Sequence, residues 1–203
     1  GIDSVVIASL DPDKRVSGQG VVDLEAANIG VFHLLDFDEL AKRVNPGYFK
    51  RQKLGMPFVR LKLATSLDGR TALANGESRW ITSSEARCEV QRYRAGSSAI
   101  ITGINTVLID NPTLTVRIDE LQLDKYQLEN NKISFLKKPL RVVVDTEKRT
   151  PDTSKIIHSE GKVKIFTAKG GKDTVKFAKN VELVQVKDVQ GRVDLRTMLE
   201  SLA

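Results

Sequence analysis

Four short apolar segments that alternate with helical stretches constrain the fold of this chain most strongly. We expect strands at residues 99–102, 140–144, 163–166 and 181–186. Helices are predicted to begin near Asn105, Asp173 and Asp194. Strands that alternate with helices favour a largely parallel sheet with helices on both faces, so the predicted fold class is α/β.

The N-terminal part carries a shorter α/β pattern of its own. The expected elements are a strand at 4–8, a turn at 11–13, a helix at about 21–27 and a strand near 29–32. This is half of an α/β layer, which is too small to fold alone. The breakers Asn45-Pro46-Gly47 then interrupt the pattern. We therefore predict a boundary near Met56, with residues 1–56 and 57–203 as separate domains.

Composition excludes several classes of protein. With 40% hydrophobic and 29% charged residues over 203 positions, the chain can bury a sizeable core and is neither disordered nor fibrous. It contains no signal peptide pattern and no run of about 18 apolar residues. The single cysteine, Cys88, rules out an internal disulfide. We expect a cytoplasmic protein that does not enter membranes.

The charge of the chain narrows the choice of ligand. Lys and Arg number 32 against 26 Asp and Glu, which gives a net charge of +6. Basic residues are scattered, aromatic residues make up 5%, and no tract interleaves the two as a single-strand groove does. We therefore expect no nucleic-acid partner, although a basic RNA-binding module stays open as an alternative. A ligand that carries phosphates is compatible with this charge.

The second domain is expected to open with a strand at 58–64, which leads into a glycine-containing turn at 65–70. Residues 82–85 form a capping-box pattern, in which Thr82 and Glu85 satisfy backbone donors at the start of a helix that runs to about Ala95. Residues 118–138 are polar and weakly periodic, so we expect a mobile insertion there.

Two predicted strand ends carry groups that suit a phosphorylated ligand. Ligands of parallel sheets bind outside the carboxyl ends of the strands. Gly103 and Thr106 lie there at a helix start, where backbone amides and a hydroxyl suit a pyrophosphate. Past the next strand, Thr146 with Lys148 or Arg149 suits the 2′-phosphate of NADP. Plain helix capping and exposed strand-end charge stay open as explanations.

Other side chains give weaker signals. Arg94 and Arg117 suit bidentate binding of a phosphate, but each alone is more often a surface arginine. Trp80 suits stacking on a flat ring, or packing in a core. His33 and His158 have no Cys, His or carboxylate at ligand spacing, so we assign no metal site.

Taken together, three long runs resemble the bifunctional riboflavin biosynthesis deaminase-reductase family. They are residues 58–72 (FVRLKLATSLDGRTA), 76–82 (GESRWIT) and 102–117 (TGINTVLIDNPTLTVR). Residues 5–12 (VVIASLDP) and 48–51 (YFKR) are similar to the end of the family's deaminase domain. The resemblance implies a dihydrofolate-reductase-like reductase domain, incomplete at its C-terminus, preceded by the C-terminal part of a cytidine-deaminase-like domain.

The resemblance also implies a reaction. The family's second domain uses NADPH to reduce the ribose of a phosphorylated pyrimidine, 5-amino-6-(5-phosphoribosylamino)uracil, to a ribityl chain. The family's cofactor contacts fall on Ala64, Trp80, Thr106, Asp110 and Thr146. Its substrate contacts fall on Ser78, Arg94, Leu114 and Arg117. Lys62 and Asp110 are candidates for orienting or protonating the sugar, with a snorkelling side chain as the plain alternative for Lys62.

Two features of the family are not found in this sequence. The deaminase half carries a zinc signature, H-x-E followed by P-C-x-x-C-type cysteines, so we expect zinc only in a part of the enzyme outside this chain. The reductase half continues into a further strand and a glycine-rich turn, so we expect truncation at both ends. A deaminase-only enzyme with a degenerate reductase half is the alternative, against which the intact predicted site residues argue. For the whole enzyme we expect a homo-oligomer, a dimer or a tetramer.

Overall fold

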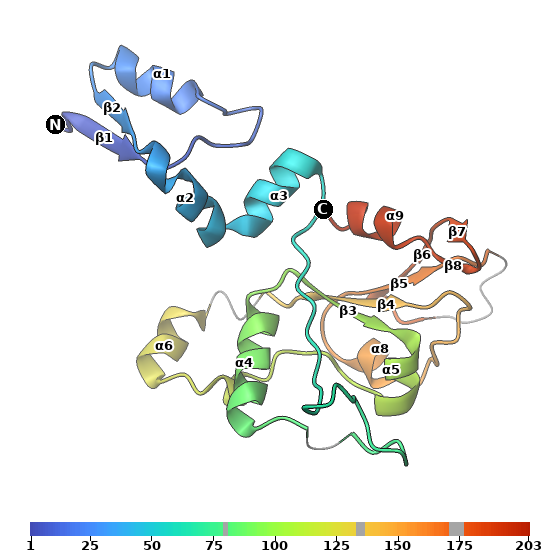
Figure 1. Ribbon diagram of the computed structural model, residues 1–203. Helices are drawn as coiled ribbons and strands as arrows, with labels where there is room; N and C mark the ends of the chain where they lie inside the picture. Colours follow the sequence, from blue (N-terminus) through green and yellow to red (C-terminus); the bar gives the residue numbers. More distant parts are fainter. Residues whose placement is uncertain (79–80, 133–136, 171–176) are drawn as a thin grey trace. The chain divides into compact units, whose positions relative to one another are not determined.

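The computed structural model describes residues 1–78, 81–132, 137–170 and 177–203 (Figure 1). The chain divides into two compact units. The first consists of Gly1–Leu61 and Arg196–Ala203, and the second of Lys62–Leu195.

The first unit is built on a two-stranded parallel sheet. β1 (Ser4–Ile7) pairs with β2 (Gly30–His33), and α1 (Gln19–Ala26) connects the two strands. The remaining elements are η1 (Leu35–Phe37), α2 (Asp38–Val44), α3 (Pro46–Leu54) and most of α9 (Leu195–Glu200). None of residues 1–61, all of which the structure describes, has a buried hydrophobic side chain. This stretch therefore contributes little core of its own.

The second unit contains a four-stranded parallel sheet with the strand order β3-β4-β5-β6. Its strands are β3 (Ala99–Gly103), β4 (Leu140–Val144), β5 (Val163–Thr167) and β6 (Val181–Gln185). A short antiparallel pair, β7 (Asp188–Val189) and β8 (Arg192–Val193), follows. The helical elements are α4 (Ser84–Ala95), α5 (Ile104–Asp110), η2 (Ile118–Leu121), α6 (Lys125–Asn130) and α8 (Lys155–His158).

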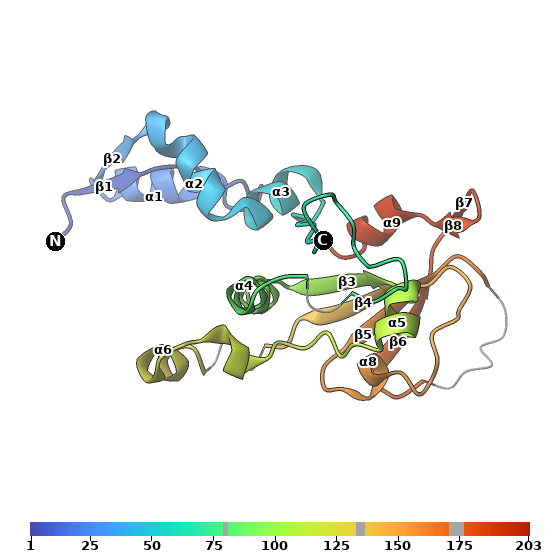
Figure 2. The same ribbon diagram turned by 60° about the horizontal axis from the view of Figure 1, so that its bottom comes forward.

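The core of the second unit lies between the sheet and two of these helices. Figures 1 and 2 show α5 and α8 on the same face of the sheet. Val143 and Ile165 pack there against Ile104, Val107 and the α8 pair Ile156 and Ile157. Val142 and Phe166, which point to the opposite face, are fully buried as well. Burial on both faces explains why β4 contains three valines in a row and why Ile165 and Phe166 are neighbours in β5.

Two predictions about local structure are wrong. Residues 58–64 form no strand, and Leu61 and Leu63 are mostly exposed; a strand needs a hydrogen-bonding partner, and no ladder in the described part of the chain includes these residues. Ser83, not Thr82, caps α4, since its hydroxyl accepts from the Ala86 amide at 3.3 Å.

The predicted insertion is better ordered than expected at its start. Residues 118–121 form η2, and Leu121 is only 2% exposed because it packs beside α4, where the Cys88 thiol donates to its carbonyl oxygen. The expected helix start near Asp173 lies outside the described residues.

Candidate functional site

The carboxyl ends of three neighbouring strands form one edge of the sheet. Gly103 of β3 is level with Val144 of β4, which is level with Phe166 of β5. Segments 104–106 and 145–149 therefore leave the sheet side by side. The predicted cofactor residues Thr106 and Thr146, both half-buried, lie in these two segments.

Side-chain contacts tie the segments at this edge together. The Arg149 guanidinium donates through Nη2 to Asn105 Oδ1 at 3.2 Å, which links the loop after β4 to the start of α5. The Thr146 carbonyl accepts from Thr167 Oγ1 at 3.0 Å, which links the same loop to β5. Thr146 Oγ1 accepts a long bond from the Val193 amide at 3.4 Å, so its own proton is available to a ligand. The edge thus presents hydroxyl, amide and guanidinium groups from adjacent strands.

Asp145 fixes the shape of the loop that carries Thr146 and Arg149. Its carboxylate is completely buried, and Oδ2 accepts from both the amide and the hydroxyl of Thr150 at 2.7 Å. Within the described residues, Oδ1 has no hydrogen-bond partner. The closed loop holds Lys148 at a left-handed φ of 56°. Sequence reasoning missed this role, for which an Asp directly after a run of valines was the available signal.

The residues predicted to orient or protonate the sugar lie on exposed parts of the chain. Asp110 is the last residue of α5 and is exposed. Lys62 is exposed in the segment that was wrongly predicted to be a strand, and Ala64 is half-buried there. Ser78 is exposed at the end of the same irregular segment. Trp80 lies outside the described residues.

The two predicted substrate arginines meet at the opposite end of the sheet. Arg94, in the last turn of α4, donates through Nη1 to the Thr115 carbonyl at 3.1 Å. Burial lowers the pKa of Arg94, and the nearby positive charge of Arg117 lowers it further. Arg117 Nη1 lies 2.7 Å from Glu120 Oε1. The segment 113–117 therefore returns to the helix that carries Arg94.

Leu114, a predicted substrate contact, is almost completely buried. It is 8% exposed and packs in the core with Ile104 and Val107. Its φ of 53° is left-handed, which is unusual for a residue with a side chain.

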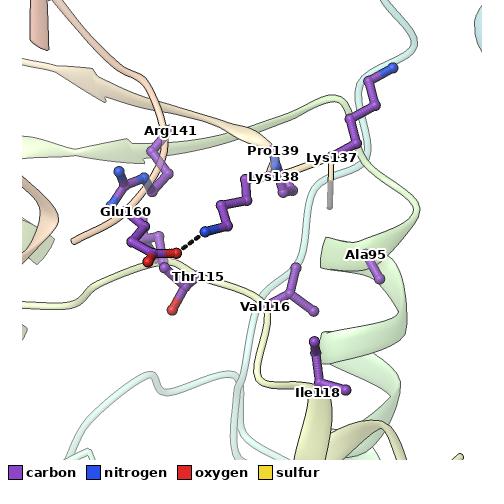
Figure 3. A pocket seen from close by; sticks show the side chains of 10 residues that line it. Ala95, Thr115, Val116, Ile118, Lys137, Lys138, Pro139, Arg141 and Glu160 are labelled. Atoms are coloured by element: carbon purple, nitrogen blue, oxygen red, sulfur yellow. Dashed lines mark ion pairs between the residues drawn. The ribbon is translucent and has the colours of Figure 1, made fainter. Parts of the chain in front are cut away.

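A cavity of about 400 Å³ lies beside this segment (Figure 3). Apolar side chains, including Val116, Ile118 and Pro139, form part of its wall. Lys137, Lys138 and Arg141 are the cations that line it. Lys138 is paired with Glu160, and Arg141 donates to several carbonyl oxygens. Neither Arg94 nor Arg117 is among its lining residues. The cavity is thus distinct from the arginine pair.

The described residues lack two further kinds of feature. Residues 1–78, 81–132, 137–170 and 177–203 contain no group of three or more His, Cys, Asp or Glu side chains that could hold a metal ion. In the same ranges, no helix combines the length and the apolar character that a membrane crossing requires.

Residues 57–203 match the family described as RibD C-terminal domain. Over its full length the chain is 38% identical to the riboflavin biosynthesis protein RibD of Escherichia coli (strain K12), of which it covers 54%. It is 44% identical over 157 residues to the protein of the same name from Haemophilus influenzae, covering 77% of this chain and 41% of that protein. The chain thus spans about half the length of the relatives it matches.

Solved structures agree with this fold. Acinetobacter baumannii RibD, form 1, matches 98% of this chain with a TM-score of 0.77 at 37% identity, and 51% of that chain is covered. A Thermotoga maritima protein, named as a diaminohydroxyphosphoribosylaminopyrimidine deaminase/5-amino-6-(5-phosphoribosylamino)uracil reductase, matches all of this chain with a TM-score of 0.78 at 28% identity, covering 51% of its own length. The predicted α/β fold of a reductase domain of this family is confirmed.

Proposed function

This chain belongs to the RibD C-terminal domain family, and on that premise we propose that it carries the reductase activity of a riboflavin biosynthesis enzyme. The reaction is the NADPH-dependent reduction of the ribose of 5-amino-6-(5-phosphoribosylamino)uracil to the ribitylamino product. The observation that carries the proposal is the joined edge of the sheet. There, Thr106, Thr146 and the linked pair Arg149 and Asn105 come from neighbouring strand ends.

The residues at this edge fit a phosphorylated dinucleotide. The hydroxyls of Thr106 and Thr146 can donate to phosphate or ribose oxygens. Lys148 and Arg149 supply positive charge where a 2′-phosphate needs it, and a guanidinium binds phosphate in a fixed geometry. Asp145 keeps the loop that presents them closed. When bound, NADPH supplies the hydride.

The substrate is proposed to extend from this edge toward the arginine pair. Arg94 precedes β3 and Thr106 follows it, and a strand of five residues spans about 16 Å. Arg94 and Arg117, joined by Ser78, would hold the 5′-phosphate at the far end. The sugar carbon that accepts hydride would lie near the cofactor edge. A phosphate, a ribose and a pyrimidine in one elongated molecule match the distance between the arginine pair and the cofactor edge.

Lys62 and Asp110 are proposed to act on the sugar. An ammonium donates a proton or a hydrogen bond to an oxygen or nitrogen that gains electron density as hydride arrives. A carboxylate orients the sugar hydroxyls by accepting from them. In this proposal Lys62 is the donor and Asp110 the acceptor at the reacting end of the substrate.

The N-terminal part and the assembly complete the proposal. We assign residues 1–56 to the end of a deaminase domain, with the zinc ion held by a part of the enzyme outside this chain. The scarcity of buried side chains in this stretch supports a role as part of a larger layer. The working enzyme is proposed to be a cytoplasmic homo-oligomer.

Cofactor titration of the full-length enzyme tests the proposal. We expect NADPH to bind more tightly than NADH, because Arg149 and Lys148 gain charge-assisted bonds only with the 2′-phosphate. Arg149→Ala should weaken NADPH roughly tenfold, since such a bond contributes about 1.5 kcal/mol or more, and leave NADH unchanged. Lys164→Ala, which removes an ion-paired cation near the start of β5, serves as the control. Equal dissociation constants of the wild type for the two cofactors would refute the assignment of this edge.

A further inference from the structure

A buried glutamine connects the backbone and the side chain of the Arg117 region. Gln91 lies on α4 and is 1% exposed. Its Oε1 accepts from the Arg117 amide at 3.1 Å, and its Nε2 donates to Glu120 Oε2 at 3.1 Å. An amide N–H can only donate and a carboxylate can only accept, so the two partners fix which end of the Gln91 amide faces which.

Glu120 closes this arrangement into a ring of contacts. Its Oε1 pairs with Arg117 Nη1 at 2.7 Å, while its Oε2 is held by Gln91. The backbone amide of Glu120 also donates to the Arg117 carbonyl at 3.2 Å. This bond holds η2 next to Arg117. Arg117 is therefore held at its backbone by Gln91 and at its guanidinium by Glu120.

Glu120 contacts only part of the Arg117 guanidinium. Among the described residues, the contact of the Arg117 side chain uses Nη1 alone. Nε and Nη2 form the other edge of the planar fork, which is the edge that suits two oxygens of one phosphate. The Arg117 side chain is also 52% exposed, so an anion from solvent can reach it.

Resting on the proposed function, we propose that Gln91 and Glu120 are positioning residues for substrate binding. Glu120 holds Nη1 of Arg117, so that Nε and Nη2 face the 5′-phosphate of the substrate. Gln91 keeps Glu120 and the Arg117 backbone in register with α4. The pair lowers the number of conformations that Arg117 must give up when the phosphate binds. Glu120 also offsets part of the repulsion between Arg94 and Arg117 before the phosphate arrives.

The test is a double-mutant cycle in the full-length enzyme, with steady-state constants for both substrates. Arg117→Ala should raise the KM for the phosphorylated pyrimidine by one to two powers of ten, as expected for a charge-assisted bond of about 1.5–3 kcal/mol. Glu120→Ala and Gln91→Leu should each raise that KM about three- to tenfold, because a positioned contact is weakened but not removed. The kcat and the KM for NADPH should change less than twofold.

The energetic coupling between the Glu120 and Arg117 substitutions distinguishes a positioning role from a general disturbance of the fold. In the Arg117→Ala background, Glu120→Ala should have no further effect on KM, because the group it positions is gone. Glu120→Gln should fall between Ala and wild type, since its single amide oxygen can replace either Oε1, which pairs with Arg117, or Oε2, which accepts from Gln91, but not both atoms. Glu89→Gln is the matched control, because Glu89 pairs with Arg92 on the same helix.

The experiment distinguishes failure of the proposed function from failure of the positioning role. An unchanged KM in Arg117→Ala would overturn the phosphate role of Arg117 in the proposed function. A raised KM in Arg117→Ala, combined with an equal effect of Glu120→Ala in both backgrounds or with no effect in either, would overturn the positioning role alone.

Discussion

Replacing Arg141 by methionine should destabilise the second unit more than any surface change in it. Arg141 is 1% exposed at the start of β4. Its guanidinium donates to the carbonyl oxygens of Thr113, Ile156, Ser159 and Gly161 at 2.7–3.3 Å, and to Ser159 Oγ at 2.9 Å. One buried cation thus satisfies backbone acceptors on two sides of the sheet's amino end.

The size of the stability loss depends on which hydrogen bonds each carbonyl acceptor keeps in the methionine variant. Gly161 O retains a bond from Asn180 Nδ2 at 3.1 Å, whereas the carbonyls of Thr113, Ile156 and Ser159 lose their side-chain donor. The cavity that Arg141 lines allows water to reach part of this region, so we assign about 1 kcal/mol to each of the three lost partners. The expected loss is about 3 kcal/mol of unfolding free energy, or roughly 10 °C in Tm.

Urea and thermal unfolding followed by circular dichroism measure this loss. Arg141→Lys should lose about half as much, because an ammonium keeps the charge but has three donors. Lys164→Met is the control, since it removes an ion pair with Glu182, whose side chain is 61% exposed, and should cost at most about 1 kcal/mol. A methionine variant as stable as the wild type would show that burying this guanidinium costs as much as its hydrogen bonds return, and the reasoning would be wrong.

Two further predictions concern single local contacts. The hydrogen bond from Tyr48 Oη to Asp11 Oδ1 at 2.5 Å raises the pKa of Tyr48 to about 12, so its stabilisation is complete below the ordinary phenol pKa near 10 and is lost as the pH rises through about 12. Difference absorbance between wild type and Tyr48→Phe should give that midpoint, and Asp11→Asn should move it down; a midpoint near 10 in the wild type contradicts the contact. Ser83→Ala should cost about 1 kcal/mol of unfolding free energy and more than Thr82→Ala, as measured by urea unfolding, because Ser83 caps α4; the reverse order would restore Thr82 as the cap.

The strands of the sheet were predictable because their signal is local. The runs at 140–144 and 163–166 are apolar except for Arg141 and Lys164, since both faces of β4 and β5 carry buried side chains, and both strands lie where they were expected. The run at 58–64 (FVRLKLA) is also rich in apolar residues but has no ladder partner in the described chain. Strand propensity describes a residue's fit to a sheet, and it cannot say whether a neighbouring strand is there.

The ligand edge was partly predictable for a related reason. Thr106, Thr146 and Arg149 follow apolar strands, and parallel strands end at one edge, so their proximity followed from topology. The bond between Arg149 and Asn105 joins residues 44 positions apart, and the bonds of Gln91 reach 26 and 29 positions along the chain. Such contacts depend on how α4 and η2 pack, which no short window of sequence contains.

The segment 111–117 shows how an irregular stretch can be held as firmly as a strand. Asn111 and Leu114, with φ of 42° and 53°, turn the chain out of α5 and back toward α4. Alternate residues are then bound by side chains instead of by a neighbouring strand: Arg141 binds the carbonyl of residue 113, Arg94 that of residue 115, and Gln91 accepts from the amide of residue 117. The period of two is that of an extended chain. Because these partners come from a strand and a helix of the same unit, the position of the residue 117 backbone is set by buried residues, although its own side chain is exposed.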